Sequence, residues 1–383
     1  GSRGLGDVYK RQINMKVGIL TQPIFNNYGG ILQAWALQLL LARLGHEPWL
    51  LRRNYHQPDD YNFLLRWFWF ASKRLLNIIR GGKDVYILEN EKLYIGTHTQ
   101  KFVEERFYHL SPIIHTAKEL TNYVKSGNFN GFVVGSDQVW RPKYSPQLSN
   151  YFLDFAKNST GIKRIAYAAS FGVDEWEFSE KEEAMARKLI PLFDMISVRE
   201  ASGVELLNKH LGVTAHHVLD PTLLVEREDY ISLVKNTTST LIKTDGDLFC
   251  YILDESTWKN ELCKDCANTL SLKPFSCYSK RRILSMNDKK HLQECIMPPV
   301  EQWIKAFIDA KMVITDSFHG MVFSIIFNKP FWIIINENRG ASRFDSLLSY
   351  FGLENRIISK NSDIVWNAPI DWSAVNKIRS ENK

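Results

Sequence analysis

The chain has 383 residues, enough for two domains of ordinary size, and its 45% of hydrophobic residues can fill two cores. Charged residues make up 23%, which argues against wholesale disorder, and the net charge of +6 favours anionic ligands or an anionic membrane surface. The basic residues are scattered and form no recognisable nucleic-acid-binding module, so we expect no nucleic acid partner. No apolar run has the length of a membrane span, and residues 1–14 look like a cloning remnant before Met15.

The first predicted elements are a buried strand at Lys16–Leu20, a helix at Ile31–Leu44 and a strand at Pro48–Leu51. Between the first two lies a polar loop that ends in N-N-Y-G-G. Its Gly29 and Gly30 either let the backbone approach a ligand or only make a tight turn. A doubly wound domain begins in this way, but the loop lacks G-x-G-x-x-G and does not indicate a dinucleotide.

Residues 62–83 predict a basic, aromatic-rich amphipathic helix. Arg66, Lys73 and Arg80 fall on one side of it, and Leu, Ile, Trp and Phe residues spread over the other. A helix of this composition can lie on a membrane surface. The alternatives are an insertion packed on the domain or an interface between subunits.

Four later segments predict buried strands that end in polar residues. They lie at about 131–140, 164–172, 196–200 and 217–221. Carboxyl ends of parallel strands share one edge of a sheet, so these residues are expected to converge on a site. They are Ser136, Asp137 and Gln138, then Ser170, then Arg199 and Glu200, and finally Asp220.

The polar stretch 226–247 is the predicted linker between an amino-terminal domain, 15–225, and a carboxyl-terminal domain, 248–370. The second domain is expected to contain strands at about 248–253, 273–277 and 356–358, and a helix at 300–310. A terminal helix is expected within 371–383. Five cysteines form no secreted framework, which favours a reduced cytoplasmic chain, and the single C-x-x-C pair, Cys263 and Cys266, is too incomplete to predict a metal site.

The stretch 312–335 predicts a strand, a polar turn, a helix and a second strand, and we expect the rest of the chain to be organised around it. Asp316, Ser317, His319 and Gly320 lie on the turn. The N–H groups at a helix start attract anions, and His319 could add a positive charge or a proton. The alternative is a capped helix with a histidine at its entrance.

The ordered motifs N-Y-G-G-I-L-Q, G-S-D-Q-V-W, A-S-F-G, S-V-R-E, D-P-T and T-D-S-F-H-G together resemble the polysaccharide pyruvyl transferase family. The resemblance implies an α/β fold with two doubly wound Rossmann-like domains facing a cleft, as in GT-B enzymes. It also implies phosphoenolpyruvate as the donor substrate, no cofactor, and a pyruvate ketal formed on a saccharide acceptor that we expect to be lipid-linked. Such an enzyme would be cytoplasmic, with peripheral contact at the inner membrane face if 62–83 docks there.

In the family the histidine of the T-D-S-F-H-G-like turn belongs to the donor site, which implies that His319 is a catalytic acid or a phosphate ligand. Arg199 is the implied partner of phosphate or carboxylate, with an ion pair to Glu200 or Asp220 as the alternative. Some members carry an arginine where this chain has Ser317, so Arg343 is our candidate for the second cation, with a surface salt bridge as its alternative. Ser317 and Gly320 complete the predicted donor-binding set.

Asp137 is the predicted carboxylate that orients the acceptor hydroxyl, because this architecture usually holds the acceptor in the amino-terminal domain; its alternative is a cap on the following turn. The other predicted acceptor-binding residues are Asn27, Tyr28, Gly29, Gln33, Ser136, Gln138 and Ser170. Two other functions stay open: a glycosyltransferase that uses a nucleotide sugar, and a saccharide-binding protein without catalysis.

Overall fold

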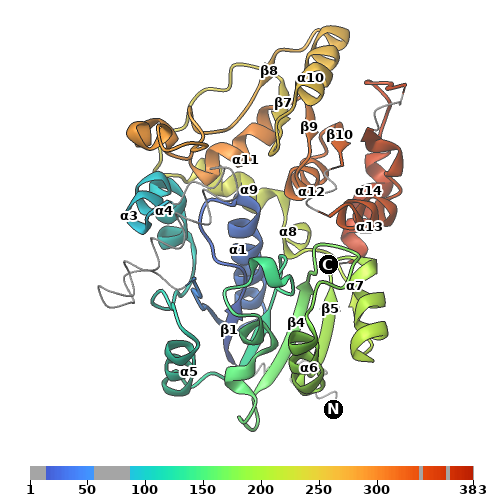
Figure 1. The fold of residues 1–383 in the computed structure, drawn as a ribbon. Coiled ribbons are helices and arrows are strands. Elements are labelled where there is room, and N and C mark those ends of the chain that lie inside the picture. Colours follow the sequence, from blue (N-terminus) through green and yellow to red (C-terminus); the bar gives the residue numbers. More distant parts are fainter. Residues whose placement is uncertain (1–13, 56–86, 336–339, 359–362, 383) are drawn as a thin grey trace, which may run out of the picture. The chain divides into compact units, whose positions relative to one another are not determined.

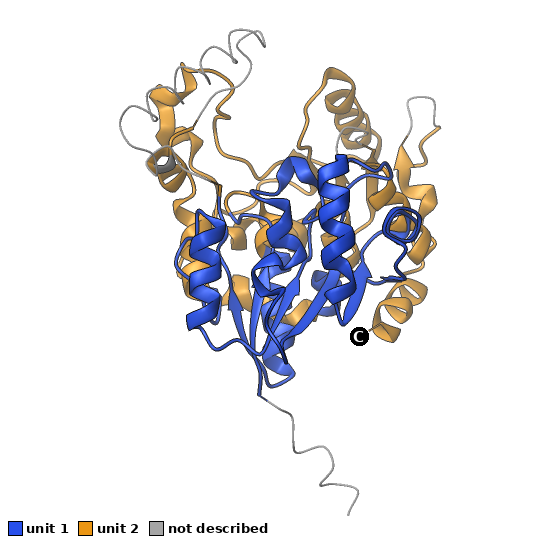
Figure 2. Ribbon diagram, turned by 60° about the horizontal axis from the view of Figure 1, so that its bottom comes forward, with its two compact units in different colours: residues 1–24, 32–54, 106–225 blue, residues 25–31, 55–105, 226–383 orange. Residues whose placement is uncertain are grey.

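The computed structural model describes residues 14–55, 87–335, 340–358 and 363–382. These residues form two compact units (Figure 2). Unit 1 takes in the described residues of 1–24, 32–54 and 106–225, and unit 2 those of 25–31, 55–105 and 226–383. The predicted amphipathic helix at 62–83 lies outside the described residues.

Unit 1 contains a parallel sheet with the order β2-β1-β3-β4-β5-β6. Its strands are β1 (Lys16–Leu20), β2 (Glu47–Leu50), β3 (Gly131–Val134), β4 (Lys163–Ala169), β5 (Met195–Val198) and β6 (His216–His217). The helices of this part of the chain are α1 (Tyr28–Arg43), α5 (Ala117–Ser126), α6 (Glu180–Leu189), α7 (Ala201–Leu206) and α8 (Pro221–Leu224). Figure 1 labels most of these elements.

Unit 2 contains a second parallel sheet, with the order β11-β10-β9-β7-β8. Its strands are β7 (Leu248–Tyr251), β8 (Pro274–Phe275), β9 (Met312–Thr315), β10 (Phe331–Ile334) and β11 (Ile357–Ile358). Its longer helices are α3 (Glu89–Ile95), α4 (Thr97–Arg106), α9 (Arg227–Lys235), α10 (Thr257–Leu270), α11 (Val300–Asp309), α12 (Phe318–Ile326), α13 (Ser342–Phe351) and α14 (Trp372–Glu381).

The two sheets share one doubly wound order, because in each unit the first strand lies between the second and the third. The chain therefore reverses its direction of winding between β1 and β3 in unit 1, and between β7 and β9 in unit 2. Ligands of doubly wound sheets bind outside the carboxyl ends of the strands at such a switch point. The predicted fold class, two doubly wound Rossmann-like α/β domains, is confirmed.

Apolar residues at regular spacing fill a separate core in each unit. In unit 1, Trp140 is fully buried, stacks on Phe152 at a centroid distance of 5.3 Å, and donates its indole N–H to Tyr151 O. In unit 2, Trp303 is fully buried and meets Phe307 and Phe323 edge to face at 4.7 and 4.8 Å. Edge-to-face packing suits the quadrupoles of aromatic rings.

The division into units differs from the predicted domains in three places. One is the segment 55–105, whose described part contains α3 and nearly all of α4 and belongs to unit 2 rather than to the predicted amino-terminal domain. The first turn of α1 belongs to unit 2, where Tyr28 stacks on Trp303 at 5.6 Å and donates its hydroxyl to Pro298 O. The predicted linker 226–247 also belongs to unit 2, since it contains α9, which buries Tyr230 and packs on α11. Because 226–247 is mostly polar, its sequence does not indicate this helix.

Candidate functional site

A buried ion cluster lies at the carboxyl edge of the unit 1 sheet. Arg199, after β5, places Nη2 3.1 Å from Asp137 Oδ1 and Nη1 3.0 Å from Asp220 Oδ2. Its Nε lies 4.0 Å from Glu200 Oε2. The sequence correctly predicted that the residues following these strands converge. The ion pair with Asp220, weighed as the alternative role of Arg199, is present in the structure.

The Arg199 guanidinium is fully buried among these three carboxylates. Burial acts to lower the pKa of Arg199, but the charges of Asp137, Asp220 and Glu200 outweigh it and raise the pKa above its ordinary value. Arg199 therefore stays charged, and the cluster contains one permanent cation against three carboxylates.

The carboxylates of Asp220 and Glu200 also accept hydrogen bonds from backbone N–H groups. Asp220 caps α8, because its Oδ1 accepts hydrogen bonds from Thr222 N at 3.0 Å and from Thr222 Oγ1 at 2.7 Å. Glu200 Oε1 accepts from Phe171 N at 2.7 Å and from Gly172 N at 3.3 Å. These bonds fix the turns after β4 and β6 against β5.

Three predicted acceptor-binding residues of unit 1 lie in this framework, and each is fully buried. Ser136 Oγ lies 2.9 Å from Asp220 Oδ2, and Ser136 N donates to Gln33 Oε1 at 2.9 Å. Gln33 Nε2 donates to Thr21 Oγ1 at 2.8 Å. Ser170 Oγ accepts from Gly172 N at 3.0 Å. These hydrogen bonds indicate that the three side chains hold the neighbouring turns together rather than contact a saccharide directly.

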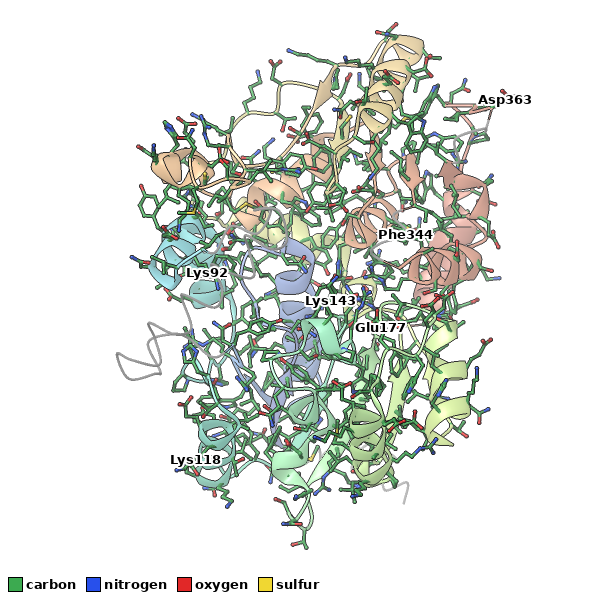
Figure 3. The ribbon with its side chains drawn as sticks, in the orientation of Figure 1. Lys92, Lys118, Lys143, Glu177, Phe344 and Asp363 are labelled. Carbon is green, nitrogen blue, oxygen red and sulfur yellow. The ribbon has the colours of Figure 1, made fainter. Side chains whose placement is uncertain are left out.

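Gln138 is the predicted acceptor-binding residue of unit 1 that is only partly buried. Its Oε1 accepts from Arg141 Nη1 at 3.2 Å, and Arg141 is held by Glu177 (labelled in Figure 3) through two bonds of 2.9 Å. The side chain of Gln138 lies across Gly172, where a Cβ would come within 2.0 Å of Oε1. Gly172 has a φ of +77°, a backbone conformation that favours glycine, whereas the Gln138 side chain could move to make room for a Cβ.

The predicted turn between β9 and α12 forms the corresponding edge of the unit 2 sheet. Ser317 caps α12, accepting a hydrogen bond from Gly320 N on its Oγ at 3.3 Å. Asp316 is fully buried and accepts from Leu253 N, from Asp254 N and from Lys259 Nζ, the last at 2.6 Å. The turn is therefore tied to the loop after β7, across the switch point.

His319 lies at the start of α12, 7% exposed, with its ring against the backbone of Gly29. A Cβ on Gly29 would lie 2.1 Å from His319 Nδ1, so any larger residue there would displace the imidazole. Gly320 has a comparable constraint, since its Cβ would lie 2.3 Å from Thr315 Oγ1. Both predicted site glycines are thus explained by close packing around the turn.

The remaining predicted residues from the loop before α1 also belong to unit 2. Asn27 is exposed, and its carbonyl accepts the first helical bond of α1, from Ile31 N. Tyr28 is 1% exposed, which leaves almost none of its surface available for the contact with an acceptor that was predicted for it. Burial raises the pKa of Tyr28 well above its usual value, with smaller contributions from Cys277 and Tyr251.

Arg343 is the predicted second donor-site cation, and it lies in the first turn of α13. Its guanidinium carbon is 5.5 Å from the ring centroid of Phe318, the first residue of α12. Phe344, labelled in Figure 3, meets the same Phe318 ring at 6.2 Å. These contacts bring the starts of α12 and α13 together, so Arg343 and His319 share one neighbourhood of unit 2.

The cysteine pair lies in the core of unit 2. Cys263 and Cys266 are buried on α10, and Cys266 Sγ contacts Met312 Sδ at 3.5 Å. Within the described ranges, no group of three or more His, Cys, Asp or Glu side chains is arranged to hold a metal ion. The same part of the chain contains no helix of the length and hydropathy needed to cross a bilayer.

Two residues of this framework were not predicted from the sequence. Lys259 lies within a polar helix, and only the tertiary fold shows that its ammonium pairs with Asp316. Thr21 follows β1 directly, and its hydroxyl donates to Ser136 O at 3.0 Å. The rule that polar residues after successive strands converge would have included Thr21, had it been applied to the first strand.

The two sheets with polar residues at their carboxyl edges define a protein of the doubly wound α/β class, in which such edges hold ligands. The family model named polysaccharide pyruvyl transferase matches residues 27–338, and the chain belongs to that family. The predicted family is thereby confirmed. No curated protein shows significant similarity to the sequence.

Several solved structures resemble the chain at low identity. One is a UDP-GlcNAc 2-epimerase from Neisseria meningitidis, 11% identical, with 96% of this chain and 90% of that chain covered and a TM-score of 0.48. Another is the glycotransferase of kitacinnamycin, 10% identical, with 96% and 94% covered and a TM-score of 0.45. A putative UDP-N-acetylglucosamine 2-epimerase from Listeria monocytogenes is 13% identical, with 95% of each chain covered and a TM-score of 0.45. The assignment of the chain rests on the family match.

Proposed function

We propose that this protein transfers the pyruvyl unit of phosphoenolpyruvate to two hydroxyl groups of a sugar in a surface-polysaccharide precursor. The product is a cyclic ketal, and inorganic phosphate is released. The observation that carries the proposal is the family match over residues 27–338, which spans all six motifs of the sequence. A lipid-linked acceptor, reached by a cytoplasmic enzyme in peripheral contact with the membrane, is part of the proposal.

The donor end of the reaction is assigned to unit 2. The start of α12 carries the positive end of a helix dipole, which attracts phosphate or carboxylate. His319 and Ser317 lie on that start, and Arg343 lies beside Phe318 on α13. An imidazolium at His319 can protonate the methylene carbon of phosphoenolpyruvate or hold its phosphate, and Arg343 supplies a charge that stays at all working pH values.

The acceptor end is assigned to Asp137 of unit 1. Among the described residues, hydrogen bonds to this carboxylate all end on Oδ1, which accepts from Arg199 Nη2 at 3.1 Å and from Gln138 N at 2.9 Å. Oδ2 is therefore the oxygen that can accept a hydrogen bond from an acceptor hydroxyl. A fixed carboxylate at this point would orient the hydroxyl for attack and take its proton.

The chemistry balances without a cofactor. Protonation at C3 of phosphoenolpyruvate makes a methyl group and an oxocarbenium-like centre at C2. The first sugar hydroxyl adds to C2 and loses its proton, and the C2–O bond to phosphate then breaks to give a second such centre. The second hydroxyl adds, its proton is released, and the products are the ketal and phosphate. Charge develops at C2 and on the leaving phosphate, where fixed cations stabilise it.

Phosphate release tests the proposal directly. Purified protein is incubated with phosphoenolpyruvate and a panel of synthetic or lipid-linked galactosides, N-acetylmannosamines and glucosides. We expect acceptor-dependent phosphate release and a ketal product that is heavier than the acceptor by one pyruvyl unit. Absence of release with every acceptor would argue against the proposed donor or acceptor class.

The second candidate is a glycosyltransferase that uses a nucleotide sugar, favoured by Ser317 at a position where some members carry arginine. A thermal-shift comparison separates the two, because a ligand that binds only the native state raises the melting temperature. Stabilisation by nucleotide sugars and not by phosphoenolpyruvate would favour this candidate. Saccharide binding without turnover, unaffected by loss of His319, would instead indicate a non-catalytic saccharide-binding protein.

A further inference from the structure

We infer that Arg199 is a positioning residue that holds the Asp137 carboxylate in place, and not a ligand of the donor. This inference rests on the proposed function, because it takes Asp137 as the group that orients the acceptor hydroxyl. It replaces the donor-binding role predicted for Arg199 from the family resemblance.

The first argument is accessibility. The Arg199 side chain has no exposed surface, and its two terminal nitrogens already donate to Asp137 Oδ1 and Asp220 Oδ2 at 3.1 and 3.0 Å. To reach a phosphate, the guanidinium would have to leave two buried carboxylates without their cation. Breaking a buried pair in this way is strongly destabilising, because it leaves an uncompensated charge in the interior.

The second argument is that Asp220 anchors the guanidinium. Asp220 is 1% exposed and accepts from Arg199 and Thr222, with Ser136 Oγ also in hydrogen-bonding distance. Arg199 N donates to Ala169 O at 3.2 Å, and Arg199 O lies 3.2 Å from His217 Nε2. Side chain and backbone of Arg199 are thus held by β4, β6 and the start of α8, so its Nη2 has one position.

The third argument is that one carboxylate of the cluster is more exposed than the other two. The side chains of Asp220 and Glu200 have no exposed surface, whereas that of Asp137 is 9% exposed. Asp137 is therefore the member of the cluster that reaches a ligand. Arg199 binds its Oδ1, so Oδ2 is the oxygen that we assign to the acceptor hydroxyl.

The test separates turnover from donor binding in the full-length protein. Arg199→Lys keeps the charge but loses the forked geometry that spans Asp137 and Asp220. We expect kcat to fall about 10- to 100-fold, as for a small misplacement of a reacting group, while the KM for phosphoenolpyruvate stays within about twofold. Arg199→Met should lower kcat further, with the same unchanged donor KM, so that lysine gives partial rescue.

Arg53→Lys is the matched control. Arg53 is also a buried arginine of unit 1, 2% exposed, but it donates to Asn150 Oδ1 and His115 O and has no contact with Asp137. This change should lower the melting temperature and leave kcat per folded molecule unchanged. A loss of kcat in Arg53→Lys equal to that in Arg199→Lys would show that general destabilisation explains both, and would overturn the inference.

If Arg199→Met does not fold, the double variant Arg199→Met/Asp220→Asn removes the cation together with one of the two fully buried carboxylates that face it. It should fold and show the same low kcat. A donor KM raised about tenfold or more, with kcat kept, would return Arg199 to the donor site. Failure of both Arg199 variants and the double variant to fold, where Arg53→Lys folds, would assign Arg199 to stability alone. Absence of turnover in the wild-type protein counts against the proposed function instead.

Discussion

Unit 1 and unit 2 wind their sheets in the same order, yet the turns at their carboxyl edges differ in chemistry. The turns of unit 1 bring three carboxylates around one guanidinium, and Asp137 is the member that reaches the surface. At the switch point of unit 2 one carboxylate, Asp316, is matched by one ammonium, Lys259, beside the start of a capped helix. One edge is suited to accept protons and hydrogen bonds, and the other to receive an anion.

The comparison teaches that the strand order fixes where a site lies, whereas the residues of the turns decide what it does. In unit 1 an excess of carboxylates is kept buried by Arg199 and by backbone N–H donors. In unit 2 the negative charge of Asp316 is balanced by Lys259 in the interior. An anion at the helix start or at His319 therefore meets no uncompensated charge from Asp316. The following experiments test this division.

His319→Gln should have the largest effect. It keeps most of the side-chain volume, which matters because His319 is 7% exposed, but it removes the titratable ring. Loss of a general acid costs about 10²- to 10⁴-fold in rate, so kcat for phosphate release should fall within that range. His291→Gln is the control, because His291 is an exposed histidine of unit 2 outside the site. Equal activity of His319→Gln and wild type would remove His319 from the mechanism.

Lys259→Met tests the neutralisation of Asp316. The change leaves a buried carboxylate without its cation, which should lower the free energy of unfolding by about 3–5 kcal/mol in urea titrations. Lys273→Met is the matched control, because Lys273 pairs with Asp245 at the same distance of 2.6 Å but on the surface. That exposed pair should contribute little to stability, because water screens it. Similar losses in the two variants would show that burial of the Asp316 pair does not matter.

Gly29→Ala tests whether activity depends on the close packing of the His319 ring against Gly29. The added Cβ would meet Nδ1 at 2.1 Å, so the imidazole must move, and kcat should fall about 100-fold with the fold retained. Gly30→Ala is the neighbouring control, because the atoms nearest its Cβ belong to the exposed Asn27 side chain, the closest being Nδ2 at 3.0 Å, and that amide can turn away. A greater loss in Gly30→Ala than in Gly29→Ala would contradict this role of Gly29.

Asp288→Asn should have the smallest effect and concerns a partly exposed network, in contrast to the buried ones. Hydrogen bonds from Ser285 and Leu284, together with Arg281, lower the pKa of Asp288 to about 2. A carboxyl with a lowered pKa stabilises the fold above its unfolded value of about 4, and that contribution is lost as pH falls towards 2. The melting temperature of the variant should therefore be slightly lower at pH 7 and converge with wild type near pH 2. A difference that grew on acidification would reverse the sign.

Much of the sheet architecture could be predicted from the sequence. Buried strands of unbroken apolar residues, such as Met312–Thr315, coincide with the observed strand, because parallel strands covered on both faces need no alternation. Helices with polar sequences were less predictable. The helix α9 falls in the stretch predicted as a linker, because its short apolar face, Tyr230 and Leu233, is interrupted by charged residues.

The sequence predicts which residues lie together in the candidate site better than it predicts the role of each residue. Strand ends identified Asp137, Arg199 and Asp220 as neighbours, since parallel strands bring their ends together. Sequence could not show that Arg199 is enclosed by carboxylates, because a guanidinium suits a phosphate as well as it suits aspartate. Nor could it show that Gly29 adjoins His319, since that contact joins residues 290 positions apart whose relation exists only in the folded chain.

The contact between Gly29 and His319 also sets an order of events during synthesis. A ribosome adds about 5–20 residues per second, so roughly 15–60 s separate the translation of the first turn of α1 from that of its partner on α12. Trp303, on which Tyr28 stacks, is also made late. A nascent chain therefore holds Tyr28 and its neighbouring glycines without their partners for most of its time on the ribosome, and the histidine is seated only when nearly the whole sequence has emerged.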